Sequence, residues 1–177
     1  MNDKRLSKGY VQVYTGDGKG KTTAALGLAL RASGHALHTY IGQFMKGQCY
    51  GERRALRDHP YIALEQYGDV HHIYSDTVTE EDIAKAHEGL ERARRAMLSG
   101  RYDIVVLDEV NVSIWFGLLT TEDVLTFLDQ KPEHVEVVLT GRRAPRALID
   151  RADLVTEMRS VRHYYQQGVA ARVGIER

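Results

Sequence analysis

A glycine-rich segment near the start of the chain constrains the fold more than any other feature of the sequence. Residues 15–23 read Thr-Gly-Asp-Gly-Lys-Gly-Lys-Thr-Thr, between the apolar residues 10–14 and the Ala- and Leu-rich residues 21–33. The first stretch is β-branched and aromatic, which predicts a strand, and Gly34 stands where a glycine commonly ends a helix. A strand that enters a glycine-rich turn and continues into a helix is the setting of a phosphate-binding P-loop.

The residue types of this loop suit a bound triphosphate. Its glycines allow backbone amides to converge on an anion, and the N-terminus of the following helix adds partial positive charge. Lys21 is placed to neutralise phosphate oxygens, and Thr22 to offer a hydroxyl to Mg²⁺. The alternative is an ordinary glycine-rich turn with incidental lysines. We predict that the loop binds the nucleotide through Thr15, Gly16, Asp17, Gly18, Lys19, Gly20, Lys21, Thr22 and Thr23.

An acidic pair follows the apolar run 102–107. Such an unbroken run is typical of a central parallel strand covered on both faces, and Asp108 and Glu109 come at its carboxyl end. A hard dication prefers oxygen ligands, so Thr22 and one of these carboxylates are the expected metal ligands beside the triphosphate. Solvated acids at an ordinary strand end are the alternative, and Asn111 is a weaker neighbour.

Two arginines follow another apolar strand, predicted at residues 135–140. Arg142 and Arg143 should therefore lie at the same sheet edge, where a guanidinium can grip phosphate through its fork of donors. From position alone, a solvated loop arginine is an equal alternative for each. Trp115 and Phe116 are interpreted as core or interface residues, and the adjacent His71 and His72 as a solvated loop.

The rest of the chain alternates predicted strands and helices. Further strands are expected at 37–44, 61–67 and 153–158, and helices at 80–99, 121–129 and 145–151. This alternation predicts an α/β fold with a mostly parallel sheet, helices on both faces and ligands beyond the strands' carboxyl ends, as in RecA-like P-loop NTPases. We expect residues 1–177 to form a single domain, with 1–8 as a polar N-terminal arm.

Composition excludes several classes of function. Lys and Arg number 24, as do Asp and Glu, so the charge excess of a dedicated nucleic-acid binder is missing. No run approaches the roughly 20 apolar residues of a membrane span, and the first residues carry no apolar signal-peptide core. Cys49 is the only cysteine, which fits a reducing compartment. We therefore expect a cytoplasmic protein that binds neither nucleic acid nor membrane.

Several segments match one family in the same order along the chain. They are Gly9 with residues 11–23, residues 43–47 with Gly51 and Glu52, residues 107–111 with 117–119, residues 139–142 with Ala144 and Pro145, residues 152–158, and Gly168 with residues 171–172 and 174–176. These segments resemble the P-loop corrinoid adenosyltransferases of cobalamin biosynthesis and salvage. The usual P-loop pattern has glycine where this chain has Thr15, and the threonine is the form found in that family.

The resemblance implies a reaction and its participants. The 5′-deoxyadenosyl group of ATP would pass to the cobalt(I) of a reduced corrinoid, and triphosphate would leave. Lys21 and Arg142 would act as catalytic residues that stabilise the departing triphosphate, with Mg²⁺ or Mn²⁺ bound nearby. The resemblance also implies a homodimer and a flavoprotein as the corrinoid reductant. No general base is required.

Two segments depart from the family, and two other functions remain open. Residues 68–74 lack the Phe and Trp pair that some members use to displace the lower ligand of the corrinoid, and His163 precedes Tyr164 where the family has proline.

The strand, loop and acidic strand alone also fit a RecA-like ATPase or nucleic-acid-associated module. A small-molecule kinase would need an arginine-bearing lid, for which the sequence gives no clear signal.

Overall fold

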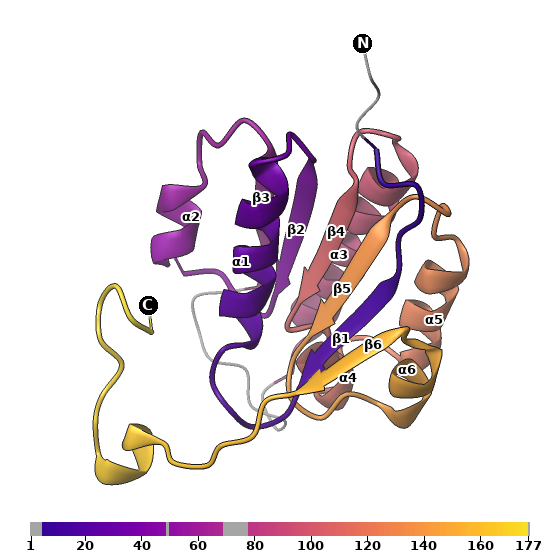
Figure 1. The fold of residues 1–177 in the computed structure, drawn as a ribbon. Helices are drawn as coiled ribbons and strands as arrows, with labels where there is room; N and C mark the ends of the chain where they lie inside the picture. The colour runs from indigo at the N-terminus through magenta and orange to yellow at the C-terminus, as the bar shows by residue number, and fades with distance from the viewer. Residues whose placement is uncertain (1–4, 49, 69–77, 177) are drawn as a thin grey trace.

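Six parallel strands form one sheet in the computed structural model, which describes residues 5–48, 50–68 and 78–176 (Figure 1). The strands are β1 (Val11–Thr15), β2 (Thr39–Phe44), β3 (Ile62–Tyr67), β4 (Ile104–Asp108), β5 (Glu136–Thr140) and β6 (Leu154–Glu157). Their order across the sheet is β3-β2-β4-β5-β1-β6. Because β5 lies between β1 and β4, the glycine-rich loop and the acidic pair flank the end of β5.

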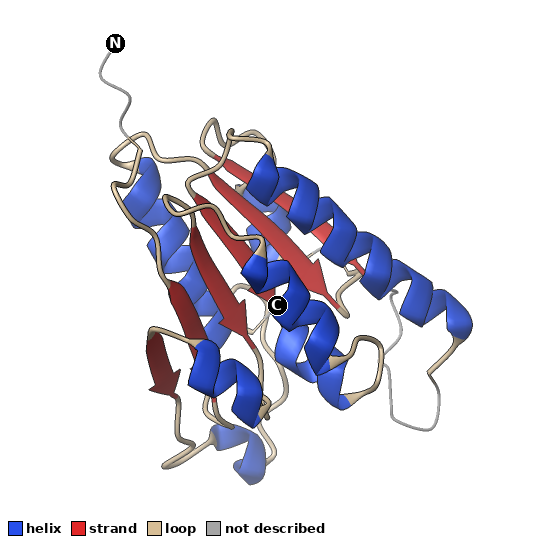
Figure 2. Ribbon diagram, turned by 90° about the vertical axis from the view of Figure 1, so that its right-hand side faces the viewer, coloured by secondary structure: helices blue, strands red, loops and turns tan. Residues whose placement is uncertain are grey.

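Helices cover both faces of this sheet (Figure 2). They are α1 (Lys21–Ser33), α2 (Gly51–Ala55), α3 (Glu80–Leu98), α4 (Val110–Trp115), α5 (Thr121–Asp129) and α6 (Arg146–Arg151), followed by the 3-10 helix η1 (Tyr164–Gln167). Helices α3, α5 and α6 share one hydrophobic cluster with the sheet, and α1 packs on the opposite face. None of the helices in the described ranges is long and apolar enough to cross a membrane.

Alternation along the central strands fills both layers of the core. In β4, Val105 and Leu107 belong to the cluster under α3 and α5, whereas Ile104 and Val106 belong to the cluster under α1. Helix α1 presents small residues to the sheet, with Ala29 fully buried. A strand that supplies both layers must be apolar at every position, which explains the unbroken run in the sequence.

The predicted α/β fold is confirmed, with differences at the ends of elements. The helix expected at 121–129 has those bounds, whereas the first strand begins one residue later and includes Thr15. Helices α2 and α4 and the 3-10 helix η1 were not predicted, because each is too short to show a 3.6-residue period. Part of the N-terminal arm, Cys49, His71 and His72 lie outside the described residues.

Candidate nucleotide-binding site

The glycine-rich loop is fastened to the end of β6. The amide of Gly18 donates a hydrogen bond to the Met158 carbonyl oxygen, with 2.6 Å between the two atoms. A Cβ at Gly18 would stand 2.6 Å from that same oxygen, so only glycine fits there. Gly20 has a φ of 123°, a region that side chains with a Cβ rarely adopt, and α1 begins at the next residue. The glycines therefore hold the loop at the N-terminus of α1.

Lys21 folds back into this loop. Its Nζ donates to the carbonyl oxygens of Gly16 and Gly18, both at 2.7 Å. Burial lowers the pKa of Lys21, and the positive charge of Arg142 adds to that effect. Neutral carbonyl groups are weak partners for a buried ammonium, so an anion inside the loop is the stronger partner for this side chain.

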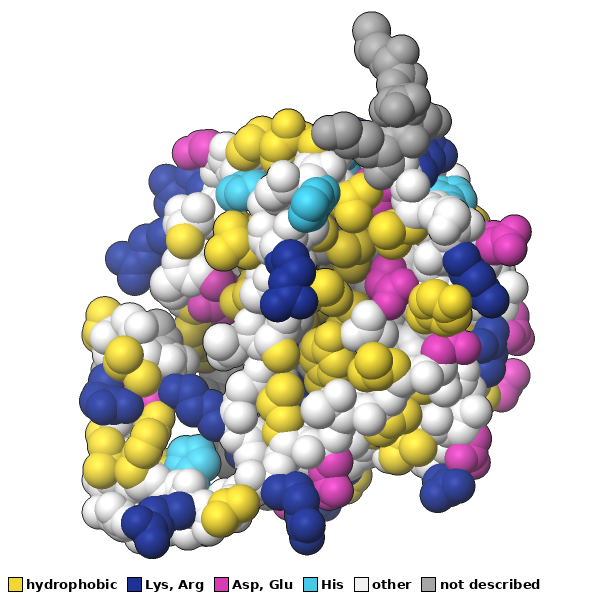
Figure 3. All heavy atoms as spheres, viewed as in Figure 1, with side chains coloured by type: hydrophobic (Ala, Val, Ile, Leu, Met, Phe, Trp, Pro, Cys, Tyr) yellow, Lys and Arg dark blue, Asp and Glu magenta, His cyan; other side chains and the backbone are white. Residues whose placement is uncertain are grey.

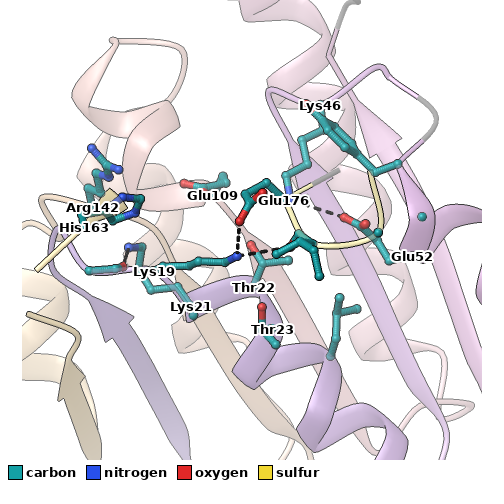
Figure 4. A pocket seen from close by; sticks show the side chains of 17 residues that line it. Lys19, Lys21, Thr22, Thr23, Lys46, Glu52, Glu109, Arg142, His163 and Glu176 are labelled. Carbon is teal, nitrogen blue, oxygen red and sulfur yellow. Dashed lines mark hydrogen bonds and ion pairs between the residues drawn. The ribbon is translucent and has the colours of Figure 1, made fainter. Parts of the chain in front are cut away.

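A pocket of about 530 Å³ opens beside the loop (Figure 4). Three regions of the chain line it: the loop and the start of α1, the segment around α2, and the C-terminal segment. The lining residues are Gly18, Lys19, Gly20, Lys21, Thr22, Thr23, Leu26, Lys46, Tyr50, Gly51, Glu52, Glu109, Arg142, His163, Gly174, Ile175 and Glu176. The volume suits a small-molecule ligand of nucleotide size.

Asp108 is buried next to the pocket and accepts four hydrogen bonds. The hydroxyls of Thr22 and Thr140 donate to its Oδ1 at 2.8 and 2.7 Å. Gln43 Nε2 and Lys46 Nζ lie 3.0 and 2.8 Å from its Oδ2. The carboxylate of Asp108 thus joins the first turn of α1 to the ends of β2 and β5.

Lys46 is the charged partner of Asp108. Its side chain is 17% exposed, and its Nζ also lies 3.8 Å from Glu52 Oε1. Burial acts to lower the pKa of Lys46, but the charge and hydrogen bond of Asp108, together with the charges of Glu109 and Glu52, raise the pKa overall. Lys46 therefore stays protonated and presents a second ammonium to the pocket beside Lys21.

Glu109 turns its carboxylate into the pocket from a left-handed backbone, with a φ of 63°. Its amide donates to the Thr140 hydroxyl at 2.9 Å, while its carboxylate accepts no hydrogen bond from any residue that the structure describes. Burial, followed by the charge of Asp108, raises its pKa. This side chain is the carboxylate at the pocket with oxygens available to a ligand.

The two arginines after β5 have different surroundings. Arg142 lines the pocket and also a neighbouring cavity of about 320 Å³, which it shares with Glu109. Arg143 stacks on Trp115, with 3.9 Å from its Cζ to the ring centroid. Trp115 keeps 48% of its surface exposed and so is not a core residue. Arg142 is the arginine that faces the nucleotide pocket.

The structure brings most of the predicted site residues together. Gly18 to Thr23, Glu109 and Arg142 line one pocket, and Asp108 lies directly behind Thr22. Thr15 and Gly16 do not line it, and Asp17 lines the smaller cavity. Residues that motif reasoning did not assign are Gln43, Lys46, Glu52, His163 and Glu176. Their only sequence signal is that most of them belong to, or adjoin, segments shared with the family.

This sheet, with a glycine-rich loop after β1, the buried Asp108 at the end of β4 and Glu109 directly after it, defines an α/β protein of the P-loop class. The model of the family described as ATP:corrinoid adenosyltransferase BtuR/CobO/CobP matches residues 7–177. The chain is 36% identical to the corrinoid adenosyltransferase of Escherichia coli strain K12 and 37% identical to corrinoid adenosyltransferase CobA of Salmonella typhimurium. Each alignment covers 96% of this chain and 86% of the relative.

A further relative, the corrinoid adenosyltransferase of a Sinorhizobium species, is 36% identical over 99% of this chain and 84% of its own length. The chain therefore belongs to the ATP:corrinoid adenosyltransferase family.

Proposed function

We propose that this protein transfers the 5′-deoxyadenosyl group of ATP to the cobalt(I) of a reduced corrinoid and releases triphosphate. The observation that carries the proposal is the pocket beside Lys21, in a chain that matches the family over residues 7–177. The electron pair of cobalt(I) forms the bond to C5′ of the ribose, and the carbon–oxygen bond to triphosphate breaks. Cobalt becomes formally cobalt(III), and the bonding pair leaves on the triphosphate.

The pocket's cations suit this leaving group. Negative charge grows on triphosphate as the bond to C5′ breaks, and fixed donors aimed at it lower the barrier. Lys21, Arg142 and Lys46 bring three positive charges to the pocket lining, and the loop amides add neutral donors. We infer that Lys21 and Arg142 hold the triphosphate and that Lys46 joins them.

The oxygen donors beside the loop fit Mg²⁺. Thr22 places a hydroxyl at the pocket, and Glu109 a carboxylate without a hydrogen-bond donor among the described residues. Both oxygens of Asp108 are already engaged, so we assign Glu109 and the Thr22 hydroxyl as metal ligands and Asp108 as the residue that orients Thr22. The metal when bound adds positive charge next to the leaving triphosphate.

An anaerobic incubation tests the proposal. Protein, ATP, Mg²⁺ and chemically reduced corrinoid are mixed, the absorbance change of cobalt–carbon bond formation is followed, and the phosphate products are separated. Adenosylcorrinoid and triphosphate in equal amounts are expected. ADP and phosphate without adenosylcorrinoid would refute the proposal and favour the RecA-like ATPase.

Replacement of Lys21 by alanine tests the pocket, and Lys8→Ala is its matched control. We expect the variant to fold and to bind ATP at least about 100-fold more weakly, because a desolvated charged contact contributes several kcal/mol. Lys8→Ala removes a lysine that does not line the pocket and should bind ATP as the parent does. Unchanged ATP binding by folded Lys21→Ala would remove Lys21 from the site.

The homodimer and the flavoprotein reductant stay predictions from the resemblance, and the cytoplasmic location stays a prediction from composition. Light scattering on the purified protein measures the mass in solution, for which twice 20.0 kDa is expected. Replacement of Mg²⁺ by Mn²⁺ should retain activity, since both favour oxygen ligands.

A further inference from the structure

The C-terminal segment, residues 159–176, lies beside the pocket with little apolar packing of its own. After β6 it runs away from the sheet and then turns back (Figure 1), and in the same view its atoms form a separate lobe at the lower left (Figure 3). Several of its large side chains face solvent, with Val161 95%, Tyr165 74% and Val173 77% exposed. Hydrophobic burial therefore cannot be what holds this segment in place, and polar contacts must do so.

Lys19 of the glycine-rich loop makes three of those polar contacts. Its Nζ lies 2.8 Å from Glu176 Oε1, 3.1 Å from the Tyr164 hydroxyl and 3.2 Å from the Ile175 carbonyl oxygen. An ammonium has three N–H donors, so these contacts use its full capacity. The side chain of Lys19 is directed at the C-terminal segment, although it belongs to the loop predicted to bind phosphate (Figure 4).

Glu176 is the centre of the same cluster on the C-terminal side. Its carboxylate accepts from Lys19, from the Tyr164 hydroxyl and from both the amide and the guanidinium of Arg172. Only 18% of its side chain is exposed, in contrast to the solvated residues around it. Two positive charges and a hydroxyl thus fix one carboxylate at the mouth of the pocket.

This cluster places the chain's last described residues on the pocket wall. His163, Gly174, Ile175 and Glu176 line the pocket, and α2 lines it as well. We propose that Glu176 is a positioning residue, which through Lys19 fastens residues 163–176 as a wall of the nucleotide pocket. The inference rests on the proposed function and adds that nucleotide affinity depends on the C-terminal segment.

The two lysines of the glycine-rich loop have different hydrogen-bond partners and therefore different roles. Among the residues that the structure describes, Lys21 has only loop carbonyls as hydrogen-bond partners, and an incoming triphosphate replaces them at little cost. Lys19 would have to break its ion pair with Glu176 to reach a phosphate. Lys19 therefore acts on the nucleotide through the wall that it holds.

Glu176→Ala tests the proposal by two measurements that need no turnover. ATP binding in the presence of Mg²⁺ is measured by calorimetry, and digestion after the exposed Arg162 is followed with trypsin. Loss of an ion pair and of the wall it holds should raise the Kd about three- to tenfold. Cleavage after Arg162 should be at least about threefold faster, because residues 159–176 would detach from the pocket more often and reach the active site of trypsin.

Three further variants make the result specific. Glu176→Gln keeps acceptors for Lys19 and Tyr164 but loses the charge, so its Kd should lie between those of the parent and Glu176→Ala. Lys19→Ala should reproduce the faster cleavage after Arg162. Asp150→Ala breaks a surface ion pair with Arg146 far from the pocket and should change neither measurement.

The two proposals fail in different ways. At saturating ATP and corrinoid, Glu176→Ala should keep kcat within about twofold of the parent while KM for ATP follows Kd. An unchanged Kd and an unchanged cleavage rate in folded Glu176→Ala would overturn the positioning role. Absence of adenosylcorrinoid with the parent protein would instead overturn the proposed reaction, whatever the binding data show.

Discussion

Replacing Asp108 by asparagine removes one negative charge from the cluster behind the pocket and keeps its shape. The amide can still accept from Lys46 and Gln43, and the hydroxyls of Thr22 and Thr140 can accept from its nitrogen. What the variant loses is the compensation for the Lys46 ammonium, whose side chain is 17% exposed. Breaking a buried ion pair costs about 3–5 kcal/mol, and the partial exposure of Lys46 places the expected loss near the lower end, at about 3 kcal/mol.

The pH dependence of that loss has a definite sign. Asp108 raises the pKa of Lys46 in the folded parent, so its stabilisation is fully present below the pKa of an unfolded lysine, about 10.4, and is lost as pH rises through the higher folded pKa. In Asp108→Asn, the Asp108 carboxylate no longer opposes the effect of burial on Lys46, so the pKa of Lys46 is lower than in the parent. The folded variant avoids burying an uncompensated ammonium when Lys46 releases its proton. The difference in unfolding free energy between parent and variant should therefore shrink as pH rises from 7 toward 10.

Urea unfolding at pH 7 and pH 9.5 measures this difference. The same substitution is made in a Lys46→Met background, where no ammonium remains to be compensated. The cost of Asp108→Asn should be smaller there by at least about 1 kcal/mol, the size of coupling found between contacting residues. Equal costs in the two backgrounds, or a cost that does not change with pH, would refute the argument.

Four other substitutions follow from the backbone and the metal ligands. Gly18→Ala puts a Cβ 2.6 Å from a carbonyl oxygen and should weaken ATP binding more than about tenfold in calorimetry, because the loop must shift. Gly27 lies in the interior of α1, and a Cβ there would have nothing within 4 Å, so Gly27→Ala should stabilise the protein by about 0.5–1 kcal/mol in urea unfolding. A Cβ at Gly89 would meet a tyrosine ring at 2.7 Å, so Gly89→Ala should destabilise by about 1–3 kcal/mol. Equal effects of the two substitutions would contradict the packing. Glu109→Gln should raise the Mg²⁺ concentration for half-maximal activity at least about tenfold, and an unchanged requirement would exclude it as a ligand.

Local sequence signals predicted the scaffold and the loop. Strand β4 has an unbroken apolar run because both of its faces are buried. In α3 only one face is buried, and apolar residues such as Ala86, Leu90 and Met97 recur there at helical spacing. Both elements appear where they were expected. The glycine-rich loop was predictable for the same reason. It lies between two adjacent elements that the chain itself connects.

The partners of Asp108 and Lys19 depend on contacts that no local pattern records. Lys46 is 62 residues from Asp108, and Glu176 is 157 residues from Lys19. The polar segments that carry Lys46 and Glu176 have no hydrophobic period, so sequence reasoning could not place their side chains. No local sequence pattern indicates the left-handed backbone of Glu109 either, and the choice between the two acids stayed open.

The position of β1 in the sheet has a consequence for synthesis on the ribosome. Within the described sheet, β1 pairs only with β5 and β6, and its register joins Val11 to Val137 and Gln12 to Leu154. A nascent chain that has not reached residue 136 has no strand for its first strand to pair with, and such distant pairing is slow to form. The loop that follows β1 is thus among the first segments translated and the last to be held in shape. Chains that have not been translated past β6 should therefore bind ATP weakly, because the strand before the loop still lacks both of its partners.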